Sequence, residues 1–299
     1  MPPTPNFSVA QLRRHFRDAL RSAGKPNADA ESRTVLLRVL DLCPADLVAD
    51  STAPVSPEHE GEILATLERR LAGEPLDMIV GERPFFGRPF SVNADVLSPR
   101  EDTEVLVRRA LERLQGVEAP RFLDLGTGSG AIAVTLLAER PDASALAVDI
   151  SPHALLVAEE NAEAHGVAER LDLAEGSWFE HVEGRFDMIV SNPPYITDAA
   201  MRDLATEVAD YDPALALAGG PDGMDAFRVI AGEARTHLQP GAPLLLEIGY
   251  DLGQGVADLL LKAGFRDVDV SKDLSGHDRV VEGFAPAPSA VLPPAEPQA

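Results

Sequence analysis

The residues best suited to chemistry are Asn192, Pro193, Pro194 and Tyr195, which follow the apolar run 186–190. An asparagine side chain offers one carbonyl acceptor and two N–H donors, whereas a proline contributes a backbone carbonyl and no N–H. Two acceptors that point the same way hold both hydrogens of a planar –NH2 group, and so favour attack by its nitrogen on an electrophile. Tyr195 adds a flat wall. The alternative is a proline turn after an ordinary strand.

A glycine-rich turn follows the strand that we expect over 121–125. Its glycines let the backbone approach a ligand closely, and the N-terminus of the next helix offers unpaired N–H groups. Asp124 stands two residues before the first glycine, and this Asp-x-Gly-x-Gly-x-Gly form favours S-adenosylmethionine as the ligand. The turn comprises Gly126, Thr127, Gly128, Ser129 and Gly130.

Asp149 ends the next expected strand, where a carboxylate accepts hydrogen bonds from ribose hydroxyls. Ribose recognition does not by itself separate cofactors. Gly126, Gly128 and Ala131 also satisfy the loose dinucleotide pattern, so a dehydrogenase or a Rossmann-like binding module is an alternative. Asn192 favours S-adenosylmethionine, because hydride transfer has no evident need for an asparagine at the end of a strand.

Composition limits the possible partners. The net charge of -23 opposes diffuse binding to phosphate backbones, where Lys and Arg contacts supply the affinity. Cys43 is the single cysteine, and the histidines show no metal-binding spacing, so neither a disulfide nor a metal site is expected. The N-terminus lacks a signal-peptide pattern, and no apolar run is long enough to cross a bilayer. We therefore expect a cytoplasmic protein that contacts neither nucleic acid nor membrane.

Amphipathic helices precede these motifs. Ser8 begins a capping box followed by apolar residues at helical spacing, and a second helix is expected over 28–42. Ser56 and Pro57 open a third helix as N-cap and first-turn proline. We expect a small helical domain over residues 1–74, whose role is to pack or to recognise a partner.

Strands and helices alternate in the rest of the chain, which predicts an open, mostly parallel α/β sheet covered on both faces. Ligands bind beyond the carboxyl ends of the strands in such sheets, so the glycine turn, Asp149 and Asn192 should share one edge. The expected strands are 121–125, 144–148, 171–174, 186–190 and 243–248, with a closing pair at 268–270 and 279–284. The expected domains are a connector with a short hairpin over 75–98, the sheet domain over 99–284 and a disordered tail over 285–299.

Together the motifs resemble the PrmC/HemK family, the protein N5-glutamine methyltransferases that modify class 1 peptide chain release factors. The resemblance covers about residues 70 to 284. It departs from the family at Glu101, where a proline is usual, and near Met78, where an aromatic residue is common. The matching segments are Asp124–Gly130, Asp149, Trp178, Asn192–Tyr195, Gly73–Leu76, Gly81–Gly87, Pro99–Glu104, Leu217–Gly223 and Gly276–Val280.

The resemblance implies a Rossmann-like class I S-adenosylmethionine-dependent methyltransferase sheet with an N-terminal helical domain for substrate recognition. It implies a monomer that methylates the glutamine of the GGQ motif in a release factor. The implied catalytic residues are Asn192, Pro193 and Tyr195. The implied cofactor-binding residues are Asp124, Gly126, Thr127, Gly128, Ser129, Gly130, Asp149, Trp178 and Asn192. The implied substrate-binding residues are Arg100, Thr103, Glu104, Asn192, Pro193, Pro194 and Tyr195.

Two related activities remain as alternatives. One is a glutamine methyltransferase that acts on a ribosomal protein, although the segment 100–104 favours the release factor. The other is an N-methyltransferase of adenine or cytosine in nucleic acid, where the same tetrapeptide holds an exocyclic amine. A flipped base needs a basic channel and aromatic stacking. The acidic balance and the 5% content of aromatic residues oppose that alternative.

Overall fold

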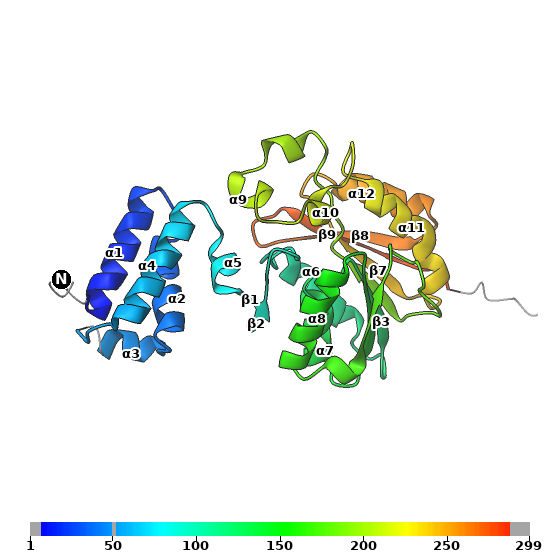
Figure 1. Cartoon of the computed structure of the whole chain (residues 1–299). Helices are drawn as coiled ribbons and strands as arrows, with labels where there is room; N and C mark the ends of the chain where they lie inside the picture. Colours follow the sequence, from blue (N-terminus) through cyan, green and yellow to red (C-terminus); the bar gives the residue numbers. More distant parts are fainter. Residues whose placement is uncertain (1–6, 50–51, 288–299) are drawn as a thin grey trace, which may run out of the picture. The chain divides into compact units, whose positions relative to one another are not determined.

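The computed structural model describes residues 7–49 and 52–287, and the chain divides into two compact units (Figure 1). The first unit comprises residues 1–81 and 205–211, and the second comprises 82–204 and 212–299. The predicted helical N-terminal domain and the predicted α/β sheet are both present, so the expected fold class is confirmed.

The first unit is helical. Its first helix begins at the predicted capping box, because Ser8 Oγ accepts the N–H of Gln11 at 3.3 Å and Gln11 Oε1 accepts the N–H of Ser8 at 2.9 Å. Leu12, Phe16 and Ile63 are fully buried in its core. The second helix ends three residues before its expected end, and two short helices were not expected. The helices are α1 (Val9–Ser22), α2 (Ala28–Val39), α3 (Pro44–Ala49), α4 (Pro57–Leu71) and α5 (Leu76–Val80).

A short segment from later in the chain completes the first unit. Helix α9 (Thr206–Ala209) carries Glu207, whose carboxylate accepts hydrogen bonds from Lys25 and from Arg70. Arg70 is 5% exposed and also pairs with Glu31 at 2.8 Å. A buried guanidinium must recover its lost hydration from carboxylates. The two glutamates therefore fix Arg70 and attach this segment to the helices.

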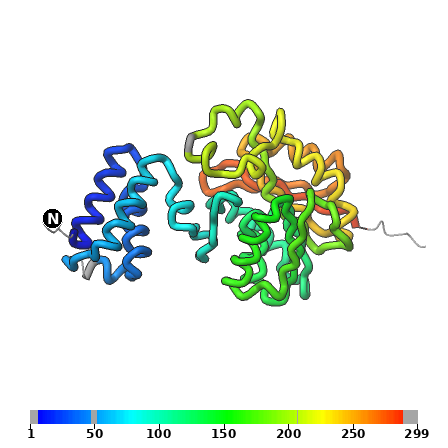
Figure 2. Tube along the Cα trace, in the orientation of Figure 1, coloured from blue at the N-terminus to red at the C-terminus, as the bar shows by residue number. Residues whose placement is uncertain are grey.

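The second unit contains a seven-stranded sheet within the described residues, in the order β5-β4-β3-β6-β7-β9-β8. The pairs from β5 to β7 are parallel, and β9 runs antiparallel to both of its neighbours. Figure 2 traces this path from the hairpin in cyan to β9 in red. The strands are β3 (Arg121–Leu125), β4 (Ser144–Asp149), β5 (Leu171–Glu175), β6 (Met188–Ser191), β7 (Pro243–Glu247), β8 (Arg266–Lys272) and β9 (Asp278–Phe284), with a separate hairpin of β1 (Glu82–Phe85) and β2 (Arg88–Ser91).

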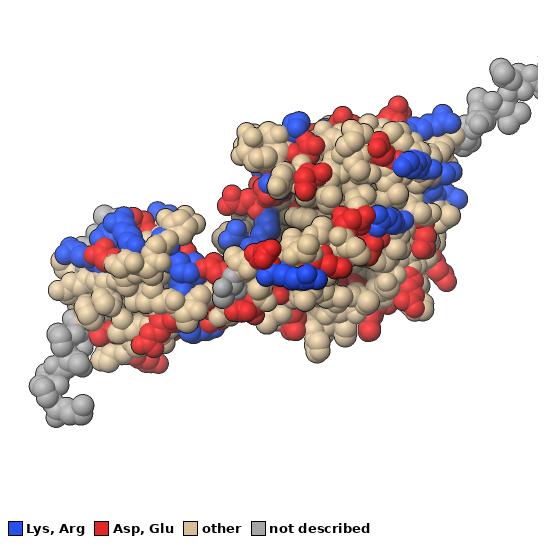
Figure 3. All heavy atoms as spheres, turned by 90° about the horizontal axis from the view of Figure 1, so that it is seen from above, with Lys and Arg blue, Asp and Glu red and all other residues tan. Residues whose placement is uncertain are grey.

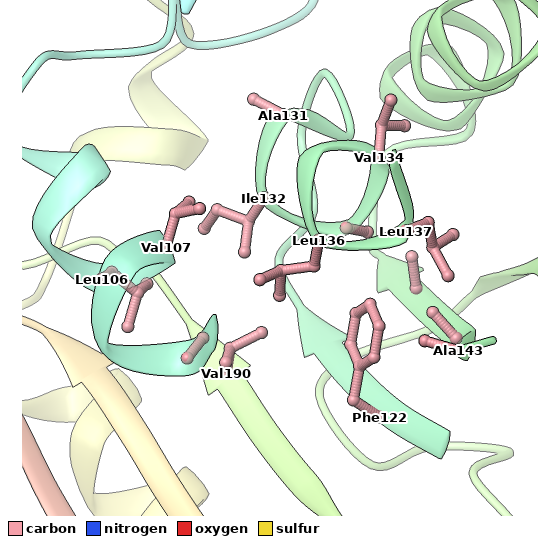
Figure 4. Close-up of a cluster of buried hydrophobic side chains, with 14 of the residues drawn as sticks. Leu106, Val107, Phe122, Ala131, Ile132, Val134, Leu136, Leu137, Ala143 and Val190 are labelled. Carbon is pink, nitrogen blue, oxygen red and sulfur yellow. The ribbon is translucent and has the colours of Figure 1, made fainter. Parts of the chain in front are cut away.

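Helices cover both faces of the sheet. Successive strand residues point to opposite faces, so Phe122 packs in one hydrophobic cluster and Leu123 in the other. Figure 4 shows Phe122 with Leu136 of α7 and Leu106 of α6 in the first cluster. That cluster is covered by α6 (Thr103–Arg113), α7 (Ala131–Glu139) and α8 (Pro152–Ala164), and the other by α11 (Asp225–His237) and α12 (Gly253–Lys262). Short helices η1 (Ala168–Arg170), η2 (Ala200–Asp203) and α10 (Ala214–Leu217) lie in the connections.

The strand order reverses between β3 and β6, because β4 and β5 follow β3 to one side while β7 follows β6 to the other. Ligands bind at such a reversal in open α/β sheets. The glycine turn leaves β3 and Asn192 leaves β6, so the two motifs emerge from neighbouring strands. The topology therefore brings together two segments that are more than sixty residues apart in the sequence.

Element boundaries differ from the expected ones in a few places. Strand β6 is shifted toward Asn192, and Phe186 instead forms an isolated bridge with Leu238. Ala285, expected in the disordered tail, is 5% exposed and donates its N–H to the carbonyl of Ala242 at 2.9 Å. The predicted loose lead over 1–6 and the tail over 288–299 lie outside the described residues. Among the described helices, none is both long and apolar enough to cross a membrane.

Candidate active site

The glycine turn is a tight backbone bend at the end of β3. The N–H groups of Gly126 and Thr127 both donate to the carbonyl of Val148, at 2.8 and 3.1 Å, which ties the turn to β4. Gly126 and Gly128 have φ values of 70° and 55°, in the left-handed region that side chains disfavour. A Cβ atom on Gly128 would meet nothing within 4 Å, so open space lies above it. The turn therefore presents bare backbone to that space.

Gly130 serves a different purpose. Its φ is 77°, and a Cβ atom there would lie 3.1 Å from Cβ of Ala158 on α8. The residue is buried and caps α7. It therefore permits close packing between α7 and α8 and does not line the cavity described below.

Asp124 lies beneath the turn. It is 0% exposed, and the hydroxyl of Thr127 donates to its Oδ2 atom at 2.7 Å. Burial raises the pKa of Asp124 to about 7, and the hydrogen bonds from Thr127 and from the N–H of Ala133 oppose that rise. The carboxyl group therefore supports the turn from inside. It does not line the cavity, and its predicted contact with a cofactor stays a prediction.

Asp149 joins the turn to the start of α8. Its Oδ2 atom accepts the N–H of Gly128 at 2.8 Å, and Oδ1 accepts the N–H of Ser151 at 2.9 Å. The residue is only half-buried and lines the cavity. The two backbone bonds fix the orientation of the carboxylate, and each oxygen keeps lone-pair capacity for a further donor.

A cavity of about 400 Å³ opens above these residues in the second unit. Trp178 lies on one wall, with its ring 3.8 Å from the position of a Cβ atom on Gly126. Ten of the predicted residues line the cavity, namely Arg100, Thr103, Gly126, Thr127, Gly128, Ser129, Asp149, Trp178, Asn192 and Pro194. The predicted residues that do not line it are Asp124, Gly130, Glu104, Pro193 and Tyr195.

These walls fit a nucleoside cofactor. The carboxylate of Asp149 suits ribose hydroxyls, the turn offers backbone without side chains, and Trp178 offers an aromatic surface. Ile132 and Ala154 add apolar surface. The described residues contain no group of His, Cys, Asp and Glu side chains that could hold a metal ion. The carboxylate, the bare turn and the aromatic wall together fit an organic cofactor with a ribose and an aromatic base.

Asn192 enters the same cavity from the end of β6. Its Nδ2 atom donates to Oγ1 of Thr103, the first residue of α6, at 3.4 Å. The preceding residue, Ser191, donates its hydroxyl to the carbonyl of Leu125 at 2.6 Å, which fixes the end of β6 against β3. The amide of Asn192 thus stands beside the glycine turn, as the sequence predicts.

The backbone at Tyr195 is clamped by the segment Leu217–Gly223. The N–H of Ile196 donates to the carbonyl of Leu217 at 2.9 Å, and the N–H of Gly219 donates to the carbonyl of Ile196 at 2.8 Å. A Cβ atom on Gly219 would lie 2.6 Å from Cα of Tyr195, and one on Gly223 would lie 2.4 Å from its carbonyl oxygen. Both glycines are therefore required for this close backbone approach.

Charged residues near the tetrapeptide are paired within the second unit. Arg100 pairs with the buried Asp212 at 2.6 Å. Glu104 accepts the N–H of Phe86 at 3.2 Å and pairs with Arg108, so it joins the hairpin to α6. The predicted substrate contact of Glu104 stays a prediction.

Glu247, the last residue of β7, was not predicted from the sequence to belong to the site. It is 2% exposed, and burial raises its pKa to about 7, while hydrogen bonds from Thr103 and Asn192 act to lower that pKa. Tyr195 lies close enough that burial and the Glu247 carboxyl raise its own pKa to about 12. The only signal in the sequence was a lone acidic residue within the apolar run 243–248.

The chain is similar to two described protein families and to named proteins. Residues 11–81 match the family described as the PrmC N-terminal domain, and residues 101–210 match the methyltransferase small domain. The release factor glutamine methyltransferase of Cereibacter sphaeroides is 48% identical over 268 residues, which cover 90% of this chain and 95% of that protein. The enzyme of the same name from Bordetella pertussis is 42% identical over 273 residues, covering 90% and 98%. A solved release-factor-specific protein-(glutamine-N5) methyltransferase from Alicyclobacillus acidocaldarius is 33% identical, with a TM-score of 0.40 over 66% of this chain and 99% of that chain.

Proposed function

Because this chain belongs to the release factor glutamine methyltransferases, we propose that it methylates the side-chain amide nitrogen of a glutamine in a class 1 peptide chain release factor. S-adenosylmethionine is the methyl donor of this enzyme class. One observation carries the proposal: the glycine turn with Asp149 and the amide of Asn192 line the same cavity. A cofactor site and an –NH2 recognition site are therefore adjacent.

On the cofactor side, we assign the ribose hydroxyls to Asp149 and the adenine to the wall formed by Trp178. The contacts of Asp149 with Gly128 and Ser151 support this role, because they fix the carboxylate before a ligand arrives. When bound, S-adenosylmethionine supplies a methyl group on a positively charged sulfur. The turn excludes side chains from the space above Gly128 and so leaves room for the cofactor.

On the substrate side, we assign the two amide hydrogens of the glutamine to Oδ1 of Asn192 and the backbone carbonyl of Pro193. An amide nitrogen is a poor nucleophile because its lone pair is delocalised into the carbonyl. Orientation and acceptors matched to the developing positive charge compensate for this weakness. One N–H hydrogen is replaced by the methyl group and leaves as a proton. No strong base is required, since that N–H becomes acidic only once methylation has begun.

We assign recognition of the release factor to two further regions. Arg100 and Thr103 line the cavity beside Asn192, where they border the entering glutamine. The helical first unit, which contains the match to the PrmC N-terminal domain, is proposed to hold the body of the protein substrate. Neither assignment changes the proposed chemistry.

The proposal includes a monomeric, cytoplasmic enzyme that does not bind nucleic acid directly. The net charge of -23 supports the last point, because phosphate binding requires clustered Lys and Arg. On the face visible in Figure 3, basic side chains are interspersed with acidic ones. Basic side chains are also neutralised by buried carboxylates, as in the ion pairs of Arg100 with Asp212 and of Arg113 with Glu282.

To test this proposal, the enzyme is incubated with labelled S-adenosylmethionine and, in separate reactions, with three possible methyl acceptors. These are a purified class 1 release factor, total ribosomal proteins and a DNA oligonucleotide. We expect label only in the release factor, and mass spectrometry should locate it on the glutamine of the GGQ motif. A release factor with that glutamine replaced by glutamate is the matched control and should stay unlabelled. Label in the ribosomal proteins or the oligonucleotide alone would contradict the proposal.

A further inference from the structure

Glu247 is a buried carboxylic acid for which the proposed reaction has no direct use. It ends β7, the strand that lies beside β6. The register pairs Ser191, the last residue of β6, with Leu246, so Asn192 and Glu247 come next along the two segments. The side chain of Glu247 is 2% exposed and does not line the cavity. It therefore contacts Asn192 from outside the cavity that Asn192 lines.

Glu247 contacts Asn192 both directly and through Thr103, because hydrogen bonds from both side chains act to lower its pKa. The Oγ1 atom of Thr103 accepts an Nδ2–H of Asn192 at 3.4 Å, and its own hydroxyl hydrogen is then free to donate to Glu247. Thr103 is 4% exposed and lies at the start of α6, so the link joins α6 to β6 and β7. Because Nδ2 of Asn192 is committed to this interior link, Oδ1 is the atom left to accept a hydrogen from the substrate.

The charge on Glu247 decides which groups donate and which accept in these hydrogen bonds. An ionised carboxylate only accepts, so the Thr103 hydroxyl must donate to it and must accept from Asn192. A protonated carboxyl can donate to Thr103, and the hydroxyl then competes as a donor for Asn192. Asp102, Arg279 and Tyr195 also face this carboxyl group.

Those neighbours are themselves constrained. Arg279 pairs with Asp102 at 2.8 Å and with Asp273 at 2.8 Å, so its charge is shared with two carboxylates. Oε2 of Glu247 is buried without a hydrogen-bond partner among the described residues. Burial outweighs the favourable contacts and raises the pKa of Glu247 to about 7. The protonation state of the group therefore changes close to neutral pH.

We infer that Glu247 is a positioning residue that, together with Thr103, orients the Asn192 amide so that Oδ1 is presented to the glutamine nitrogen. The inference rests on the proposed function and adds a residue to it. The ionised form enforces the productive orientation, and the protonated form relaxes it. Glu247 does not touch the substrate.

The test compares Glu247→Gln with the wild-type enzyme, using release factor as the methyl acceptor. We expect kcat to fall about 10- to 100-fold. The loss is smaller than for deletion of Asn192, because the amide remains and only its orientation is no longer fixed. The KM for release factor and the Kd for S-adenosylmethionine should stay within about two-fold, since the substrate and cofactor contacts remain. The rise of wild-type kcat with pH near 7 should be absent from the variant.

Glu282→Gln is the matched control. Glu282 is a 1% exposed carboxylate on β9 that pairs with Arg109 and Arg113 and does not line the cavity. This variant should lower the unfolding free energy and leave kcat and its pH profile unchanged. If Glu247→Gln does not fold, Thr103→Val should show the same loss of kcat and Thr103→Ser should restore it.

A double-variant cycle separates positioning from general damage. In the Asn192→Ala background, Glu247→Gln should lower kcat by no more than about two-fold, because the amide that it positions is already absent. Independent effects in the double variant, or unchanged kcat in both Glu247→Gln and Thr103→Val, would overturn the inference. A wild-type enzyme that leaves release factor unmethylated would instead overturn the proposed function.

Discussion

Two buried carboxyl groups flank the strand that carries Asn192: Asp124 on β3 and Glu247 on β7. Burial raises the pKa of each to about 7, and each has one oxygen without a hydrogen-bond partner among the described residues. They differ in the origin of their contacts. Asp124 is held by Thr127, three residues away, whereas Glu247 is linked to Thr103, on a helix far earlier in the chain.

This difference divides the site into two sides. The cofactor side, residues 124–130 with Asp149, is organised largely by contacts between neighbours in the chain or on adjacent strands. The acceptor side, Asn192–Tyr195 with Thr103 and Glu247, is assembled from α6, β6 and β7. Changes on the cofactor side should therefore alter cofactor affinity, and changes on the acceptor side should alter the transfer rate.

The largest effect is expected for Asn192→Ala. The variant removes the proposed acceptor for the glutamine N–H and leaves the glycine turn and Asp149 intact. The transfer rate should fall roughly 100- to 1000-fold, as for deletion of a preorganised group that acts on the transition state. The Kd for S-adenosylmethionine, measured by calorimetry, should change less than about two-fold.

Asn192→Asp sharpens this test. The aspartate keeps an oxygen acceptor but loses the Nδ2–H donor to Thr103, so its orientation is no longer fixed. We expect severe loss of activity in this variant as well. Near wild-type turnover in the folded alanine variant would contradict the separation of the two sides.

The next effect is on the pH dependence of stability. The pKa of Glu247 rises from an ordinary 4.5 to about 7 on folding, so between these pH values the folded protein binds more protons than the unfolded one. Its contribution to the unfolding free energy therefore falls as the pH rises through this window, by roughly 3 kcal/mol in full. Glu247→Gln has no such ionisation. In urea titrations from pH 4.5 to 7.5, the unfolding free energy of the variant should fall less steeply with pH than that of the wild type. Parallel curves would contradict the raised pKa of Glu247.

A somewhat smaller effect is expected for Asp149→Ala on the cofactor side. Loss of hydrogen bonds from the ribose to a charged acceptor should cost roughly 1.5–3 kcal/mol, or about 10- to 150-fold in Kd. The kcat at saturating cofactor should change little. Asp142→Ala, at an exposed carboxylate just before β4, is the control and should bind normally. Calorimetry that shows equal affinities for the two variants would exclude the ribose assignment.

The smallest effects separate two glycines of the same turn. Gly128→Ala and Gly130→Ala each place a side chain at positive φ, which should cost about 1 kcal/mol or more of unfolding free energy. Only Gly128 lines the cavity, whereas Gly130 packs against Ala158. Thermal unfolding should therefore show losses for both variants. Binding assays should show weaker cofactor affinity for Gly128→Ala alone.

Much of the cofactor side could be predicted because its signals are local. Glycines at positive φ, Asp124 next to Thr127 and a carboxylate at a strand end are each visible within a few residues. The strand β3 and the capping box at Ser8 were predicted with their observed boundaries for the same reason. Short helices such as α5 lacked a periodic pattern and were missed.

The acceptor side was only partly predictable. The proline pair marked the end of β6, and Asn192 was expected at the ligand edge, where it is found. Thr103 was included only through the resemblance to a known family. Glu247 was missed, because an acidic residue within an apolar run does not reveal what it faces.

The sequence by itself therefore determined the longer helices, the central strands of the sheet and the turn that only glycine adopts easily. These properties depend on φ preferences and on the alternation of apolar side chains over short distances. The tertiary structure alone decided that β6 lies between β3 and β7, and that Thr103 reaches Asn192 and Glu247. Such contacts depend on the pairing of strands that lie more than fifty residues apart in the sequence. The raised pKa of Glu247 has the same origin, since burial by distant segments removes its carboxyl group from water.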